Sequence, residues 1–263
     1  MMRLEVISRA PTTVPRSTPI LFVHGAWHGA WAWEDHYLPY FADHGYHVHA
    51  LSLRGHGNSE GRAGLRWYSI SDYVADIKQV ADTLPAPPII IAHSMGGYTL
   101  FKYLEQYSAA AGVLVAALPT VGALGMVLRL LSKNPVVFVK MLAQLKLYPL
   151  VGTPELARRH LYTPATADAI VQRTYERLQD ESFRVFIEIA LQSFTAPKPL
   201  RAPVMVIGAE NDGFFTPDEQ RAIARAANTT AIIVPDTGHN MMCEASWQTS
   251  ADHILAWLAE RGL

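Results

Sequence analysis

Short apolar runs recur along the chain and alternate with longer segments of mixed polarity. The runs cover residues 19–24, 46–53, 88–93, 112–117, 203–208 and 230–235. Continuous apolar runs of this length are typical of strands that are covered on both faces. The segments between most of them have helical length, as at 69–84, 96–107 and 246–260. The alternation therefore predicts an α/β fold with a mostly parallel sheet and helices on both of its faces.

The alternation stops between residues 119 and 200, where the strand pattern gives way to helical patterns. These cover residues 124–131, 134–147, 153–161 and 182–194. The proline-rich stretch 195–203 then returns the chain to the strand pattern, in the manner of a linker. We therefore expect a core formed by residues 1–118 and 201–263, with an inserted helical cap over 119–200. A chain of 263 residues is long enough for one large domain that carries such an insertion.

The composition argues against several classes of protein. The formal net charge is −1 and 17% of the residues are charged, so a nucleic-acid partner is not expected. The one cysteine, Cys243, excludes an intrachain disulfide, and the first residues lack the apolar stretch of a secretory signal, so we expect a cytoplasmic protein. Residues 106–128 carry no charge over a length that could span a bilayer, but Pro119 and several glycines favour a strand, a loop and a helix instead.

Ser94 stands where an apolar run passes into a helical segment. The sequence Ala92-His93-Ser94-Met95-Gly96 is a variant of the G-x-S-x-G pattern, with alanine at the first glycine position. That pattern holds a nucleophilic serine on a sharp turn between a strand and a helix, and small flanking residues let neighbouring backbone approach. Serine is also a favoured residue at the start of any helix, so a capping role remains the alternative.

A nucleophilic serine needs a base and an acid, and both residue types follow later strand-like runs. Asp212 follows the run at 203–208, and His239 follows the run at 230–235 after a glycine. The chain order of serine, aspartate and histidine is that of the α/β-hydrolase arrangement. Glu210 and Asp236 remain rivals for the role of the acid.

Residues 24–31, with the sequence HGAWHGAW, follow the first apolar run and are rich in glycine. Acyl transfer needs backbone N–H groups that stabilise the developing oxyanion. We expect Ala26 to supply one of them, with Trp27 as the alternative, and Met95 to supply the other. His24 and His28 are four residues apart, but the glycines of this stretch make it a poor helix and the HExxH pattern is absent. A metal is therefore not expected.

Together these motifs make the chain resemble the α/β-hydrolase superfamily, in particular its serine esterases and lipases. Monoacylglycerol lipases and the methylesterase and hydroxynitrile lyase group are the most similar kinds, and residues 53–61, with the sequence LRGHGNSEG, add to the likeness. The resemblance implies an eight-stranded, mostly parallel sheet, an inserted helical cap and no cofactor. Two departures stand out: Ala92 replaces the usual glycine, and Ser52 lies where many relatives carry aspartate.

The resemblance also narrows the reaction. Relatives with aspartate at the position of Ser94 form alkyl-enzyme esters, whereas a serine forms an acyl-enzyme. We therefore expect a serine hydrolase that cleaves carboxylic esters of apolar acyl or aryl substrates. The alternatives are a lactonase or an acylglycerol lipase, a hydroxynitrile lyase or a carbon-carbon hydrolase, and a non-catalytic receptor for a small ligand.

The insertion is apolar, which predicts a small apolar ester as the substrate. The side chains expected to line the pocket are Trp27, Met126, Leu130, Phe138, Met141, Phe186 and Phe214. The alternative is that most of them pack the cap onto the core. Lys133, Lys140 and Lys146 indicate at most peripheral contact with a membrane surface. The pattern does not indicate an oligomeric state.

Overall fold

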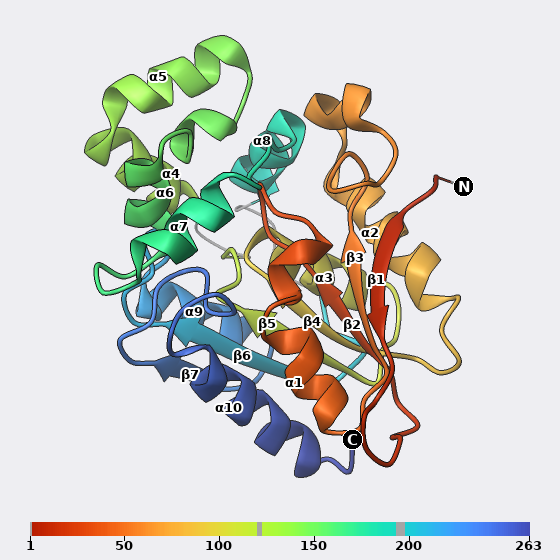
Figure 1. Cartoon of the computed structure of the whole chain (residues 1–263). Coiled ribbons are helices and arrows are strands. Elements are labelled where there is room, and N and C mark those ends of the chain that lie inside the picture. Colours follow the sequence, from red (N-terminus) through yellow and green to blue (C-terminus); the bar gives the residue numbers. More distant parts are fainter. Residues whose placement is uncertain (1, 120–122, 193–197) are drawn as a thin grey trace.

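A seven-stranded sheet forms the centre of the described structure, a computed structural model that describes residues 2–119, 123–192 and 198–263 (Figure 1). Its strands lie in the order β1-β3-β2-β4-β5-β6-β7, and only β1 runs antiparallel to its neighbour. The strands are β1 (Glu5–Arg9), β2 (Ile20–Val23), β3 (Val48–Ser52), β4 (Ile89–His93), β5 (Ala111–Val115), β6 (Val204–Ala209) and β7 (Ala231–Val234). Each of the six predicted apolar runs forms a strand, so the mostly parallel sheet is confirmed.

The expected count of eight strands is wrong for the residues that the structure describes, which form seven. Strand β1 was also not among the predicted runs. It pairs with β3 at the edge of the sheet, where Glu5 lies opposite Ser52, and its side chains are half-buried or exposed. A strand in that position does not need a continuous apolar sequence, so the signal that revealed the other six strands is missing.

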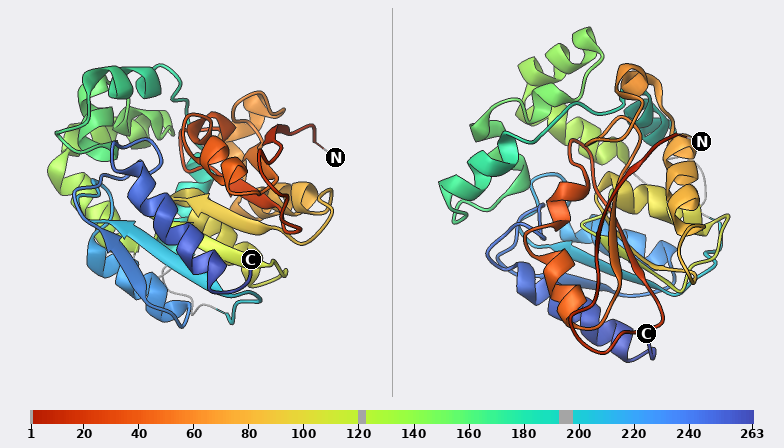
Figure 2. Two further views of the ribbon diagram at one scale, coloured as in Figure 1. Left: turned by 60° about the horizontal axis from the view of Figure 1, so that its bottom comes forward. Right: turned by 45° about the vertical axis from the view of Figure 1, so that its right-hand side comes forward.

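Helices cover both faces of the sheet (Figure 2). On one face lie α1 (Tyr37–Asp43) and α10 (Trp247–Ala259), and on the other lie α2 (Ile70–Ala81), α3 (Met95–Leu104) and α9 (Pro217–Ala226). Strand β2 shows the alternation of side chains: Ile20 and Phe22 join the core beneath α1 and α10, while Leu21 and Val23 join the core on the other face. The predicted packing of helices on both faces is confirmed.

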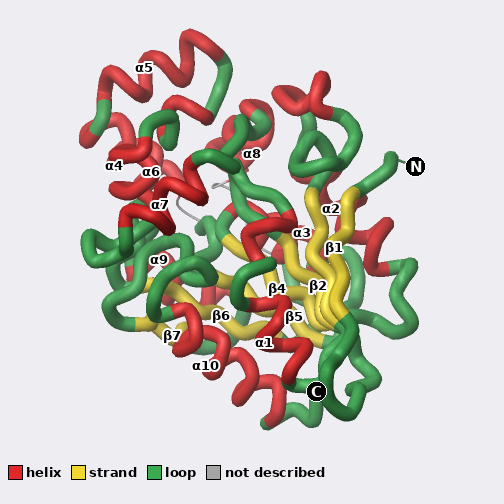
Figure 3. Tube along the Cα trace, viewed as in Figure 1, coloured by secondary structure: helices red, strands yellow, loops and turns green. Residues whose placement is uncertain are grey.

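The helices between β5 and β6 form a separate group beside the sheet (Figure 3). They are α4 (Ala123–Lys133), α5 (Pro135–Gln144), α6 (Pro154–Leu161), α7 (Asp168–Tyr175) and α8 (Phe183–Gln192), with the short 3-10 helix η3 (Tyr148–Leu150) after α5. We call residues 119–200 the insertion. Within it, 120–122 and 193–197 lie outside the described residues, as do the first three residues of the expected linker 195–203.

Local sequence signals account for where several helices begin. Ser69 accepts a hydrogen bond from the backbone N–H of Asp72, whose carboxylate accepts one from the N–H of Ser69 in return, so α2 begins with a capping box. Thr216 and Glu219 make the same pair of bonds at α9, and Pro217 occupies its first turn. In the three described stretches of the chain, no helix is long and apolar enough to cross a membrane.

Candidate active site

Ser94 lies on a sharp turn between β4 and α3. Its φ angle is 54° and its ψ angle is −119°, a backbone conformation that residues other than glycine rarely adopt. Close packing explains the small residues nearby: a Cβ atom on Gly96 would lie 2.3 Å from the carbonyl oxygen of His24. The Ser94 side chain makes no capping bond to α3. The hydroxyl is therefore available for a different partner.

That partner is His239, which follows β7. Its Nε2 atom lies 2.9 Å from Ser94 Oγ, and its Nδ1 atom lies 2.8 Å from Oδ2 of Asp212, which follows β6. The other carboxylate oxygen of Asp212 accepts the backbone N–H groups of Phe214 (2.8 Å) and Phe215 (3.0 Å). With Nδ1–H donated to the carboxylate, Nε2 is the ring atom that can accept the hydrogen bond of the Ser94 hydroxyl. Three residues from distant parts of the chain thus form one hydrogen-bonded series.

The two rival acids lie elsewhere. Glu210 and Asp236 are exposed, and the Glu210 carboxylate accepts the backbone N–H of Asp236 at 3.2 Å. The side chain of Asp212, by contrast, is fully buried. Geometry therefore favours Asp212 as the acid that faces His239.

A second histidine, His93, is hydrogen-bonded to the backbone of His239. His93, the last residue of β4, donates its Nε2–H to the carbonyl oxygen of His239 at 2.9 Å. Burial holds the pKa of His93 well below its ordinary range, so this ring is neutral. The rings of Phe214 and Phe215 meet the His239 ring edge-on, with centroids 5.1 Å and 5.3 Å away. These contacts fix the orientation of the His239 ring.

Two buried histidines hold the backbone of the loop that follows β2, residues 24–28. His24 Nδ1 donates to the carbonyl of Gly25 (2.8 Å), while its Nε2 accepts the N–H of Leu53 (3.0 Å). His28 Nδ1 donates to the carbonyl of Ala26 (2.7 Å). Burial lowers the pKa of His28 to about 4 and that of His24 well below its usual value. Both rings are neutral and bonded to the backbone.

These bonds set the direction of the neighbouring amides. Because C=O and N–H point in opposite directions across a trans peptide, the bond from His24 to the Gly25 carbonyl turns the N–H of Ala26 away from His24. Ala26 lines one cavity together with Ser94 and Met95. Met95 is the first residue of α3, where N–H groups have no acceptor within the helix. Trp27 has a φ angle of 67°, and its carbonyl accepts the N–H of Gln179 at 3.0 Å.

A cavity beside Ser94 lies between the core and the insertion. Its lining is Ala26, Trp27, Ser94, Met95, Leu118, Met126, Leu130, Leu147, Leu150, Glu181, Val185, Phe186, Ile189, Phe214 and Phe215. Trp27 and Phe214 stack in its wall, with ring centroids 5.5 Å apart. Every lining residue apart from Ser94 and Glu181 is apolar or aromatic. The space therefore suits an apolar group placed next to the serine hydroxyl.

Five of the seven predicted lining residues border this cavity: Trp27, Met126, Leu130, Phe186 and Phe214. Phe138 and Met141, also predicted to line the pocket, do not border this cavity. Both lie on α5, which packs against α4 and η3, and both side chains are buried. Sequence reasoning missed Glu181, because an isolated acid between two helices carries no periodic signal.

Ser52, the second departure from the family pattern, has a carboxylate beside it after all. Its hydroxyl donates to Oε2 of Glu5 on β1 (2.6 Å) and accepts the N–H of Ala30 (2.8 Å). The same carboxylate accepts the backbone N–H of Asn58 at 3.0 Å. Glu5 thereby fastens the loop of residues 53–61 to the edge of the sheet.

The α/β-hydrolase class is defined by a mostly parallel sheet with a serine on the turn after one strand. An acid and a histidine follow later strands, and helices are inserted over the same end of the sheet. The chain belongs to the alpha/beta hydrolase family, whose sequence profile matches residues 20–252. It is therefore a hydrolase of α/β fold, and the expected family and fold are confirmed.

Several relatives are named as lipases or esterases. A monoacylglycerol lipase of Mycolicibacterium smegmatis is 24% identical over 94% of this chain and 90% of that protein. Methyl jasmonate esterase 1 of Vitis vinifera is 33% identical over 35% of each chain. The crystal structure of a monoacylglycerol lipase from Paleococcus ferrophilus superposes with a TM-score of 0.73 over 98% of this chain and 99% of that one, at 18% identity. At that identity the last likeness shows the fold alone.

Proposed function

We propose that the protein is a serine hydrolase that cleaves carboxylic esters of small apolar acyl or aryl substrates. The observation that carries the proposal is the unbroken series of hydrogen bonds from Asp212 through His239 to Ser94 Oγ, at 2.8 Å and 2.9 Å, ending at an apolar cavity. The lipase and esterase names among the relatives support ester hydrolysis in general.

In the first half of the reaction, Ser94 Oγ attacks the ester carbonyl carbon while His239 Nε2 takes the hydroxyl proton. Asp212 orients the ring and stabilises the imidazolium. The backbone N–H groups of Ala26 and Met95 stabilise the negative oxygen of the tetrahedral intermediate. When that intermediate collapses, His239 gives its proton to the leaving alcohol, and the acyl group stays on Ser94.

In the second half, water takes the place of the alcohol. His239 removes one proton from the water as its oxygen attacks the acyl carbonyl, and the same two N–H groups hold the second oxyanion. Collapse returns the proton to Ser94 Oγ and releases the carboxylic acid. No metal or cofactor takes part in this sequence.

Steady-state hydrolysis of p-nitrophenyl esters from acetate to palmitate tests the proposal, with Ser94→Ala as the control. We expect turnover by the wild type and none above background by the variant, and the preferred chain length measures the acyl group that the cavity admits. A folded wild type that cleaves no ester would contradict the proposal. Assays with lactones and cyanohydrins, and a ligand-binding screen, would then test the lactonase, lyase and receptor alternatives.

A further inference from the structure

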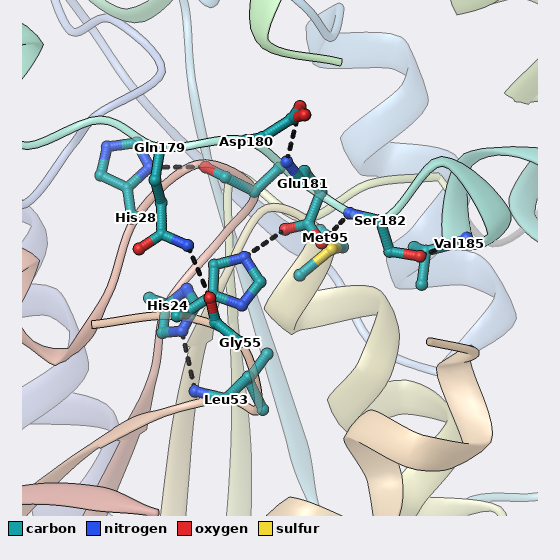
Figure 4. A network of polar contacts seen from close by, with 12 residues as sticks. His24, His28, Leu53, Gly55, Met95, Gln179, Asp180, Glu181, Ser182 and Val185 are labelled. Carbon is teal, nitrogen blue, oxygen red and sulfur yellow. Dashed lines mark hydrogen bonds and ion pairs between the residues drawn. The ribbon is translucent and has the colours of Figure 1, made fainter. Parts of the chain in front are cut away.

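Glu181 is a buried carboxylate in the wall of the cavity, on the segment that leads into α8 (Figure 4). Its Oε1 atom accepts the hydroxyl of Tyr73 and the backbone N–H of Ser182, both at 2.6 Å. Its Oε2 atom lies 3.0 Å from Nε2 of His56, whose side chain is also fully buried. A residue of the insertion is thus bonded to two residues of the core.

The hydrogen bonds of His56 determine how many protons the pair holds. Its Nδ1 atom faces the carbonyl oxygen of Arg54 at 3.1 Å, while its Nε2 atom faces the carboxylate. Both bonds form only if Nδ1 carries a proton and a further proton lies between Nε2 and Oε2. Burial raises the pKa of Glu181, but the positive charge of His56 and the hydrogen bonds to the carboxylate lower it on balance. Because the carboxylate of Glu181 already accepts hydrogen bonds from Tyr73 and Ser182, we assign the further proton to His56 Nε2, and the pair is neutral overall.

Other ionisable groups surround the pair without supplying this proton. The centroid of the His24 ring lies 4.9 Å from that of the His56 ring. The His24 ring is neutral, and each of its two nitrogens is bonded to one backbone group. The Asp180 carboxylate accepts the N–H groups of Leu147 and Tyr148. The groups that face the pair from each packed element are His24 and His28 after β2, Arg54 after β3, Tyr73 and Asp76 on α2, and Asp180 before Glu181.

The segment that carries Glu181 also holds the loop after β2. The backbone N–H of Gln179 donates to the carbonyl of Trp27 at 3.0 Å. The Gln179 side chain donates to the carbonyl of Gly55 at 3.0 Å (Figure 4). It also accepts the N–H of Gly57 at 3.0 Å. Trp27 has a positive φ angle, a strained conformation that persists only where its surroundings hold it. Residues 179–182 are therefore bonded to the loop that contains Ala26 and to the loop that contains His56.

We propose that Glu181 and His56 are positioning residues for the oxyanion site: their shared proton seats residues 179–182 against Trp27 and so fixes the direction of the Ala26 N–H. This inference rests on the proposed function, because it assigns a task in the same reaction. Loss of the proton has two effects. The carboxylate no longer has a donor at His56, and its negative charge stands unbalanced in the wall of the cavity where the oxyanion forms.

Two substitutions test the hydrogen bonds of Glu181 separately from its negative charge. In Glu181→Gln the amide oxygen can accept from Tyr73 and Ser182, while the amide N–H₂ donates to a neutral His56, so the bonds persist without the extra proton. In Glu181→Leu these donors lose their acceptors. Glu244→Gln is the matched control, since Glu244 is also buried and joins the insertion to the core through Thr163 and Thr166, but does not line the cavity.

The experiment measures kcat and KM for the best p-nitrophenyl ester from pH 6 to 10, well below the unfolding temperature of each variant. We expect Glu181→Leu to lower kcat about tenfold or more with little change in KM, because a misplaced donor weakens binding of the transition state. Glu181→Gln should retain most of the wild-type kcat, and its kcat should fall less at alkaline pH than that of the wild type. Glu244→Gln should leave kcat and the pH profile unchanged.

Two results would overturn the inference. One is a folded Glu181→Leu variant with the kcat and pH profile of the wild type. The other is a Glu181→Gln variant that loses as much kcat as Glu181→Leu, because the retained hydrogen bonds would then make no contribution to kcat. If Glu181→Leu does not fold, Glu181→Gln and the spectroscopic measurement decide.

Nitrogen NMR of His56 in the wild type reads the proton directly and does not depend on turnover. We expect both ring nitrogens to carry protons at pH 7, and the Glu181→Gln variant to carry one. A ring with a single proton in the wild type would overturn the inference even if esters are cleaved. Conversely, a doubly protonated ring in a protein that cleaves no ester would leave the pair intact and refute only the proposed function.

Discussion

At the scale of single residues, backbone strain collects at the ends of the parallel strands. Trp27 follows β2, Ser94 follows β4 and Ala116 follows β5, and their φ angles are 67°, 54° and 41°. Such conformations cost free energy and persist where neighbouring bonds determine them. Ser94 N–H donates to the carbonyl of Val115 at 2.9 Å, and Ala116 N–H donates to that of Ile207 at 2.8 Å. The sheet itself therefore holds Ser94 in its strained conformation on the turn.

The acid that faces His239 can be tested by removing its charge alone. In Asp212→Asn the buried side chain keeps its size, but its amide can no longer hold His239 in the tautomer that accepts the Ser94 proton. We expect kcat for ester hydrolysis to fall by about ten-thousandfold, as in the corresponding protease variant, while thermal unfolding shows an intact fold.

Glu210→Gln is the matched control for that variant, because Glu210 lies near the same loop and is exposed. It should retain the wild-type kcat. Near-normal turnover by Asp212→Asn together with a loss in Glu210→Gln would transfer the role of the acid to Glu210.

At the scale of elements, the insertion and the core meet backbone against backbone. A Cβ atom on Gly213 would lie 2.5 Å from the carbonyl oxygen of His160 and 2.7 Å from that of Arg159, both in the last turn of α6. Arg129 on α4 adds a second tie, with bonds to Glu219 on α9 and to the carbonyl of Phe214. The loop that presents Asp212 is therefore supported by helices of the insertion.

Replacing Gly213 tests this contact. Gly213→Ala forces a methyl group against backbone atoms, which we expect to lower the free energy of unfolding by about 1–3 kcal/mol. It should also lower kcat, because the displaced loop carries Asp212. Urea unfolding and ester hydrolysis measure the two effects.

Gly125→Ala on α4 provides the comparison, because a Cβ atom there would have no neighbour closer than 3.6 Å. In a helix this exchange should stabilise the fold by about 0.5–1 kcal/mol and leave kcat unchanged. Equal effects of the two substitutions would contradict the role assigned to Gly213.

The sequence signals differ in strength from one element to another. The six parallel strands were predictable because their sequences are continuously apolar, as burial on both faces demands in β2 to β6, whereas β1 at the edge and α7 carry weaker patterns. The order of Ser94, Asp212 and His239 was predictable because each follows a strand. That α5 does not border the cavity was not predictable, since this depends on how α5 packs against α4 and η3. The roles of all site residues, the cap boundaries and peripheral membrane contact stay predictions.

At the scale of the whole molecule, several histidines are buried in the neutral form. Burial holds the pKa of His28 and of His160 at about 4, and those of His24 and His93 well below the ordinary value of 6.5. In the unfolded chain these histidines bind protons near pH 6.5, whereas in the folded protein they stay unprotonated at that pH. Their contribution to stability is therefore complete above pH 6.5 and is lost as the pH falls from 6.5 towards 4.

We expect the free energy of unfolding to fall across that range by about 1.4 kcal/mol per pH unit for each such histidine. Urea unfolding between pH 8 and pH 4.5 measures the slope. His160→Phe, which preserves a flat contact with the Phe214 ring, should reduce the slope by the share of one histidine. A flat profile in the wild type would show that these rings take up protons in the folded state.

The bond from Glu5 to Ser52 links the beginning of the chain to the loop that carries His56. A carboxylate that the family pattern leads one to expect within β3 is here supplied by the neighbouring strand β1, in the ladder position directly opposite. We therefore expect the residues at positions 5 and 52 to vary together among related sequences. In practical terms, trimming the first nine residues would remove Glu5 and so loosen the loop of residues 53–61.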